Sequence, residues 1–151
     1  MQSVQDHDIN MTREMFIESL LKTFGVESWN ALAYGMEHGW LEYEDELCKN
    51  DPVTRKHIAR ILHMFLLKEK GICDLPDIGG AGVLRDLYDC HVCANHVAQI
   101  YLRGIMDAKD LASDGGFLWF DLDGEDSQEN IHEYIRRTVE TVNNEGKVAT
   151  L

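Results

Sequence analysis

Two cysteines and a histidine in one short segment are the most reactive side chains that this sequence brings together. Cys90-His91-Val92-Cys93 is followed by His96. Zinc takes four nitrogen or sulfur ligands, and this spacing supplies three of them, with Cys73 as a candidate for the fourth. No second pair follows, however, and buried reduced thiols are the commoner state of such cysteines. We therefore expect reduced cysteines and no cofactor. A structural zinc site at Cys73, Cys90, Cys93 and His96 is the alternative.

The same Cys-x-x-Cys spacing occurs in redox-active thiol pairs. In thioredoxin-like proteins the pair follows a strand, and no strand is predicted before Cys90. Redox chemistry is therefore a minor alternative.

An acidic segment, 121–126, resembles half of a calcium-binding loop. The glycine that such a loop needs at its sixth position is Asp126 here, and the twelfth position is His132 rather than glutamate. We expect a solvated acidic loop in which Asp126 or Ser127 caps the following helix.

Two Thr-Arg pairs stand where helices are expected to begin, Thr12-Arg13 and Thr54-Arg55. An arginine in the first turn, beside outward-pointing N–H groups, offers a fork of donors to an anion. The alternative is that the threonines cap the helices while the arginines pair with surface acids. Trp29 offers a flat apolar face for a sugar ring, although core packing is the commoner use of a tryptophan.

A catalytic constellation is not found in the sequence. The seven histidines are scattered, and no Ser-His-Asp or Cys-His-Asn grouping can be assembled from them. The glycine-rich stretch 79–82 lacks the lysine and the preceding strand of a phosphate-binding loop. We expect a protein that is not an enzyme.

The elements that position these residues are predicted to be helices. Apolar residues at helical spacing predict helices over 12–24, 28–38, 54–69, 91–105 and 127–142. A helical turn is expected over 83–88, and 117–122 is either a short strand or a loop that plugs the core. The fold class is therefore all-α, with a single helical domain at 11–143 between a polar N-terminal tail, 1–10, and a C-terminal tail, 144–151.

An internal repeat underlies these helices. Met11-Thr12-Arg13-Glu14 recurs as Val53-Thr54-Arg55-Lys56, and the apolar positions that follow superimpose. The short helix that ends at Gly39-Trp40-Leu41 recurs as one that ends at Gly104-Ile105-Met106. We expect a bundle of short-helix and long-helix units whose third unit, at 127–142, is degenerate because Ser127-Gln128 replaces the Thr-Arg pair.

This arrangement resembles the S-layer homology family of domains. Their unit is a helix with a Gly-Ile-type turn, a loop, and an Ile-Thr-Arg-Ala-Glu-like start to a second helix. Residues 29–41 followed by 50–55 are similar to a whole unit, and 11–16 to the second half of one. The resemblance covers about 11–69 closely and 93–142 loosely.

The resemblance implies a non-catalytic module that binds an anionic cell-wall polysaccharide. The residues it points to are the helix starts Thr12, Arg13, Thr54 and Arg55, and the turn and aromatic positions Trp29, Gly39, Trp40 and Gly104. The alternative is an intracellular interaction or scaffold protein that uses the same fold and binds a protein partner, and a homo-oligomer is compatible with it.

The charge of the chain limits its partners. The chain has 27 acidic and 14 basic residues and a net charge of −13, which phosphate backbones and anionic membrane surfaces would repel. Nucleic acid is therefore not expected as a partner, and no apolar run is long enough for a membrane span. Residues 1–10 do not resemble a signal peptide, which favours the cytoplasm, whereas the family resemblance favours the cell surface.

Overall fold

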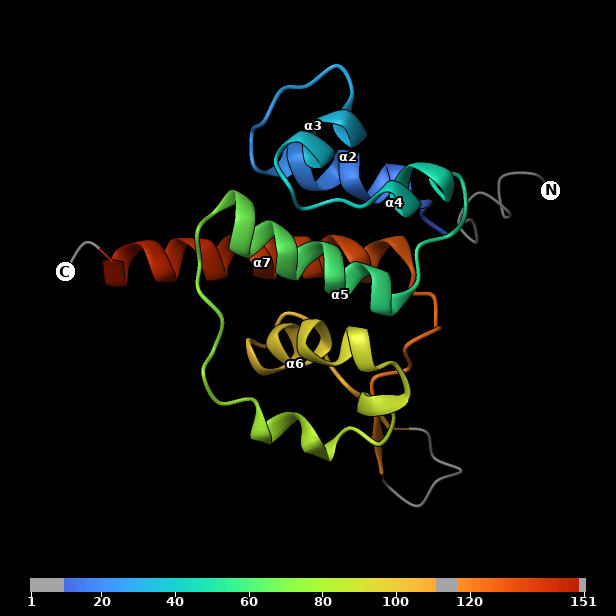
Figure 1. Ribbon diagram of the computed structural model, residues 1–151, viewed down its shortest axis with the longest axis vertical. Coiled ribbons are helices and arrows are strands. Elements are labelled where there is room, and N and C mark those ends of the chain that lie inside the picture. The colour runs from blue at the N-terminus through green and yellow to red at the C-terminus, as the bar shows by residue number, and fades with distance from the viewer. Residues whose placement is uncertain (1–9, 111–116, 150–151) are drawn as a thin grey trace.

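The computed structural model describes residues 10–110 and 117–149, with side chains as far as residue 145 (Figure 1). Most of the predicted N-terminal tail, Gly115 and Gly116 of the predicted loop, and the last two residues lie outside this part of the chain. The model is 58% helix with six α-helices and one small two-stranded sheet. The mostly helical content confirms the predicted all-α class, and the repeat organisation stays a prediction.

The first helices begin at polar caps. Helix α2 spans Arg13–Thr23, and the Thr12 hydroxyl accepts a hydrogen bond from Met15 N at 3.2 Å. Helix α3 spans Ala31–Glu37 and is capped by Asn30, whose side chain accepts from Ala33 N at 3.1 Å. The helix predicted over 28–38 therefore begins later, since Asn30 provides the capping oxygen.

A short helix, α4, spans Tyr43–Leu47 and was not predicted. It is held by reciprocal bonds at its first turn, in which Glu42 N donates to Asp45 Oδ2 at 2.8 Å. This is a capping box with carboxylates at both positions. The prediction missed it because five residues are too few to show an apolar period.

Helix α5 spans Arg55–Met64 and continues as a turn of π-helix, η1, over Phe65–Glu69. Its predicted apolar stripe is confirmed, because Ile58, Ile61, Leu62, Phe65 and Leu66 are all at most 1% exposed.

The chain then crosses the molecule through three short 3-10 turns. These are η2 (Gly79–Val83), η3 (Leu87–Asp89) and η4 (His91–Cys93), and the last leads directly into α6 (Ala94–Leu102). The helix predicted over 91–105 is thus shorter at both ends. The turn predicted over 83–88 is divided between η2 and η3.

The segment predicted as either a strand or a core-plugging loop is partly each. Strand β2 (Leu118–Trp119) pairs antiparallel with β1 (Lys109–Asp110). The next residue, Phe120, is fully buried.

The last helix, α7, spans Gln128–Ala149 and extends past the end predicted at 142. No apolar period supports this last part. Glu145 instead accepts a hydrogen bond from Arg103 Nη1 at 3.2 Å, which ties it to the end of α6.

Figure 1 shows α2, α3 and α4 gathered on one side of the molecule and α6 on the other, with α5 and α7 between them. Helix α2 contacts α3 and α7, and α5 contacts α6. The core is continuous through these contacts and includes Phe16, Trp40, Phe65 and Phe120. In the described part of the chain, no helix has both the length and the apolar character to cross a membrane.

Candidate functional site

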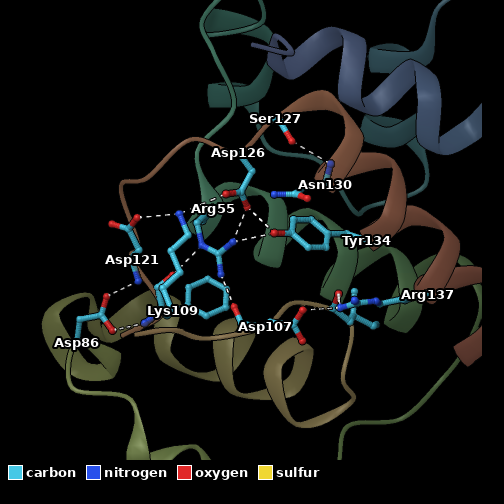
Figure 2. Close-up of polar contacts among 12 residues, drawn as sticks. Arg55, Asp86, Asp107, Lys109, Asp121, Asp126, Ser127, Asn130, Tyr134 and Arg137 are labelled. Atoms are coloured by element: carbon cyan, nitrogen blue, oxygen red, sulfur yellow. Dashed lines mark hydrogen bonds and ion pairs between the residues drawn. The ribbon is translucent and has the colours of Figure 1, made fainter. Parts of the chain in front are cut away.

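Arg55, one of the two arginines predicted to grip an anion, lies in the interior at the start of α5 (Figure 2). It is 1% exposed, and each of its three guanidinium nitrogens has an acceptor. Nε donates to Phe120 O at 2.7 Å, Nη2 to Asp107 O at 2.6 Å, and Nη1 to the Asp126 carboxylate and to the Tyr134 hydroxyl at 2.9 Å. The side chain is a structural link between α5, the 107–126 segment and α7.

Asp126 is the acid of this cluster and is 5% exposed. It also accepts from the Tyr134 hydroxyl at 2.6 Å, and Lys109 Nζ lies 3.3 Å from its other oxygen. Burial would raise the pKa of Asp126, but the Tyr134 hydrogen bond and the Arg55 charge hold it below its usual value. Burial and the bond to Asp126 raise the pKa of Tyr134 to about 12. The carboxyl group is therefore ionised and the phenol protonated at neutral pH.

Arg13, the equivalent residue at the start of α2, is 3% exposed. Its Nη1 donates to Glu44 Oε1 and Asp45 Oδ1, both at 3.1 Å, and its Nη2 donates to His57 Nδ1 at 2.9 Å. Asp45 is fully buried and also accepts from Arg60 at 2.6 and 3.1 Å. Burial would raise the pKa of Asp45, but the bonds from Arg60 bring it below its usual value.

The tautomer of His57 follows from its neighbours. Arginine can only donate, so Nδ1 of His57 is an acceptor, and the Thr54 hydroxyl donates to the same atom at 2.8 Å. The proton is then on Nε2, which lies 3.3 Å from Glu44. Burial and the charges of Arg13 and Arg60 lower the pKa of His57 to about 4. The ring is therefore neutral at physiological pH.

These contacts favour the capping and ion-pairing alternative for the two Thr-Arg pairs, with one correction. The acids that the arginines bind include the buried Asp45 and Asp126 rather than surface groups alone. Thr12 caps α2 with its side chain, whereas the Thr54 hydroxyl is engaged with His57 instead of a backbone N–H.

The first backbone N–H groups of both helices are also engaged. Arg13 N donates to Asp51 O at 2.9 Å and Glu14 N donates to Lys49 O at 3.0 Å. At α5, Arg55 N donates to Gly124 O and Lys56 N to Leu122 O, both at 2.9 Å. Each helix start is thus covered by the loop that leads into a later helix. The outward-pointing donors expected for an anion are already satisfied.

Trp29 departs from the expectation of core packing, because it is 95% exposed. It stands in the loop between α2 and α3, beside a groove of about 450 Å³. The groove has an apolar floor of Leu21, Val26 and Ala31, and its polar lining is Glu18, Lys22, Glu27 and Ser28. It is larger than three other cavities of the described residues, which have volumes of about 270, 180 and 260 Å³.

Trp40 has the opposite setting. It is 1% exposed, packs edge-on against Phe65 with ring centroids 5.1 Å apart, and donates from Nε1 to Glu69 Oε1 at 3.1 Å. Glu69 also accepts from the Tyr34 hydroxyl at 2.6 Å. Trp40 is therefore a core residue and cannot contact a ligand without unfolding.

Gly39 and Gly104 end their helices in the same way. Both have positive φ, 83° and 76°, a conformation that favours glycine. Gly39 N donates to Met36 O and Trp40 N to Gly35 O, while Gly104 N donates to Tyr101 O and Ile105 N to Ile100 O. The two turns that were aligned in the sequence thus have the same pattern of backbone hydrogen bonds, and both glycines have a structural role at a helix end.

The cysteine segment differs from both the reduced and the zinc-bound expectation. Cys90 and Cys93 are joined by a disulfide, while Cys73 is free and exposed. The Sγ atoms of Cys90 and Cys93, two of the four candidate zinc ligands, are thus bonded to each other. Within residues 10–110 and 117–149, no group of three or more His, Cys, Asp or Glu residues could hold a metal ion.

His96, the histidine of that segment, is bonded to a second histidine. Asp74 can only accept, so His63 donates to it from Nε2 at 2.7 Å, and His63 Nδ1 and His96 Nδ1 share a second hydrogen bond at 2.7 Å. Burial and the neighbouring His63 and Arg60 lower the pKa of His96 to about 4.

The acidic loop has the cap that was expected. Ser127 Oγ accepts from Asn130 N at 3.1 Å at the start of α7. Asp121 pairs with Lys109 at 3.1 Å and Lys56 with Asp123 at 2.8 Å, so two of the acids have a lysine partner, while the Asp123 side chain stays 81% exposed.

Sequence reasoning missed the acceptors that make these arginines structural. Asp45, Asp126 and Tyr134 are all buried. The segment of Asp45 was not interpreted, Asp126 was considered as a calcium-loop position or a helix cap, and Tyr134 lies in a helix predicted from its apolar period. Buried acids need partners, but the sequence does not reveal which acids are buried.

A comparison with known proteins finds no family model, no curated protein and no solved structure that matches this chain. The resemblance to S-layer homology domains therefore stays a prediction that rests on the motifs.

Proposed function

We propose that this protein is a non-catalytic carbohydrate-binding module whose contact surface is the groove beside Trp29. One observation carries the proposal: a tryptophan side chain that is 95% exposed lines a groove of about 450 Å³. An exposed indole costs hydrophobic free energy, which a ligand that covers it would recover. The family resemblance adds that the ligand is a cell-wall polysaccharide.

The chemistry of the groove suits a sugar chain. The indole face can pack against the C–H face of a pyranose ring, while the ring hydroxyls reach polar groups around it. Glu18, Lys22, Glu27 and Ser28 are exposed and supply both donors and acceptors. A volume of about 450 Å³ is in the range of small-molecule sites, roughly 300–1,000 Å³.

The proposed site is not the one that the motifs suggested. Arg13 and Arg55 are buried and engaged, so they are assigned to the fold and not to the ligand. Lys22 is the only cation in the lining of the groove, and it forms no ion pair within the described residues. An anionic polysaccharide would therefore be recognised through Lys22.

The test is sedimentation with purified cell-wall sacculi, followed by titration with solubilised wall polysaccharide. Wild type should pellet with the sacculi, and Trp29→Ala should lose at least tenfold in affinity, the effect of about 1.4 kcal/mol of lost stacking. Tyr43→Ala is the matched control, because Tyr43 is an exposed aromatic residue (66%) outside the groove. Equal pellet fractions for Trp29→Ala and wild type would exclude the groove as the site.

A second variant tests the charge of the ligand. Lys22→Gln should weaken binding to an acidic polysaccharide and make it less sensitive to salt, while binding to a neutral one stays unchanged. If Lys22→Gln has no effect on acidic chains, the anionic part of the proposal fails while the stacking part stands.

A protein-interaction module is the second candidate, and one observation favours it. Tyr43 and Leu47 lie one turn apart on α4, and each is 66% exposed. Acidic residues flank them, and the chain carries a net charge of −13, so the partner that fits is a basic polypeptide with an apolar face. Salt-sensitive binding of a synthetic Leu- and Lys-rich amphipathic peptide, weakened by Leu47→Ser and not by Trp29→Ala, would favour this candidate.

A further inference from the structure

The disulfide between Cys90 and Cys93 has a position that the carbohydrate proposal does not use. It lies in the η4 turn that leads into α6, and both cysteines are partly exposed. A bond between residues that are three apart in sequence closes a very small loop, so it restricts the unfolded chain little and stabilises the fold little. Such a bond is better placed for chemistry than for holding the fold together.

The two sulfur atoms have different electrostatic surroundings. Cys90 lines a groove with Asp86, Asp89, Asp121 and Asp123, where Lys56 is the only cation. Negative charges disfavour a thiolate there.

Cys93 lines a separate cavity of about 180 Å³. Its lining contains Lys56, Arg60, Glu42 and Glu44, so its charges are balanced rather than negative. Cys93 is also the N-cap residue of α6, a helix of nine residues. The positive end of the helix dipole lowers the pKa of a thiol at that position. Of the two thiols, Cys93 is therefore the one that ionises more readily once the bond is reduced.

We propose that Cys90–Cys93 is a redox-active disulfide that exchanges with small thiols of the glutathione class, with Cys93 as the leaving thiolate on reduction and the attacking thiolate in the reverse direction. The inference is independent of the Trp29 groove, which lies between α2 and α3.

The exchange is a two-step, two-electron reaction. A thiolate of the small thiol attacks Sγ of Cys90, the Cys90–Cys93 bond breaks, and Cys93, the thiol that ionises more readily, leaves as a thiolate. A second thiolate attacks the sulfur of the attached small thiol, forms the small-molecule disulfide and releases Cys90 as a thiolate, which takes a proton from water. Overall, two thiols are oxidised to one disulfide, and the protein disulfide is reduced to two thiols.

The first experiment asks whether the bond exchanges in the folded protein. The background is Cys48→Ser/Cys73→Ser, which removes both free thiols. After equilibration with millimolar reduced glutathione, we expect Cys90 and Cys93 to be reduced by mass spectrometry after alkylation. We expect unchanged far-ultraviolet circular dichroism, with a melting temperature within about 8 °C of the oxidised form.

Either of two results would overturn the proposal. One is a bond that stays oxidised in millimolar reduced glutathione under native conditions, whether or not excess dithiothreitol reduces it. The other is reduction that unfolds the chain, which would make the bond structural.

The second experiment tests the assignment of Cys93. In the reduced protein at neutral pH, iodoacetamide should modify Cys93 about tenfold faster than Cys90, because the thiolate is the nucleophile and Cys93 ionises more readily. Equal rates, or a faster Cys90, would overturn the assignment. As a second readout, oxidised glutathione should leave a stable mixed disulfide on Cys93 in the Cys90→Ser variant, and less in Cys93→Ser.

Discussion

The buried ion pair between Arg55 and Asp126 gives the sharpest prediction about this fold. The substitution Arg55→Met keeps an unbranched side chain of similar length at the start of α5 and removes the guanidinium. Asp126 would then be left 5% exposed with its charge. Removing one partner of a buried pair costs about 3–5 kcal/mol, because the other charge stays buried without compensation.

The structure places the cost near the lower end of this range. Lys109 Nζ lies 3.3 Å from Asp126 and Tyr134 donates to the same carboxylate at 2.6 Å, so part of the charge stays compensated. The carbonyls of Phe120 and Asp107 lose their donor as well. We expect a loss of about 3–4 kcal/mol, which for a domain of this size lowers the melting temperature by roughly 6–16 °C.

Thermal and urea unfolding followed by circular dichroism measures this loss. Arg136→Met is the control, since Arg136 is an α7 residue whose ion pairs with Glu133 and Glu140 are at the surface, and its effect should stay within about 0.5 kcal/mol. Adding Asp126→Leu to Arg55→Met should restore about 1–2 kcal/mol by removing the uncompensated charge. The reasoning is refuted if Arg55→Met melts within about 2 °C of wild type, or no lower than Arg136→Met.

Three further predictions concern pH, turns and the exposed tryptophan. The fold holds the pKa of His57 and His96 at about 4, below their unfolded value, so the stability they contribute is fully present above pH about 6.5 and is lost as pH falls to about 4. Thermal melts from pH 7 to 4 should show a falling melting temperature, and the double variant His57→Gln/His96→Gln should make this fall shallower. Gly39→Ala and Gly104→Ala should each cost about 1–2 kcal/mol in urea unfolding, because both positions have positive φ, and an effect below a few tenths would contradict the turn geometry. Trp29→Ala should change the free energy of unfolding by less than about 0.5 kcal/mol, since the side chain packs against little, and a larger loss by the same assay would show that it belongs to the core.

The sequence predicted the features that depend on local spacing. The apolar stripe of α5, from Ile58 to Leu66, is visible as a helical period, and the core confirms it. The turns at Gly39 and Gly104 were aligned from the sequence, and both form the same pattern of backbone hydrogen bonds. Short-range order of this kind is encoded within a few residues of where it appears.

The features that failed depend on distant contacts or on burial. Arg55 was interpreted as a surface donor because its acceptors, 52 to 79 residues away, leave no trace near it in the sequence. Trp29 was left between a sugar-binding face and core packing, because the sequence does not reveal whether a tryptophan in a loop is covered. Helix α7 was ended too early because its last part is tied to α6 by Arg103 and Glu145 rather than by an apolar period.

The acceptors of Arg55 also determine when the fold can be completed during synthesis. All of them, from Asp107 to Tyr134, lie on the C-terminal side of α5, so a ribosome finishes α5 long before it delivers the groups that neutralise its first residue. In a nascent chain that ends before Asp126, either the Arg55 guanidinium is buried without its carboxylate partner or the start of α5 does not pack against the rest of the fold. Folding therefore requires the segment that follows α6, which holds these acceptors. Products truncated before it should fail to fold and be exposed to proteolysis.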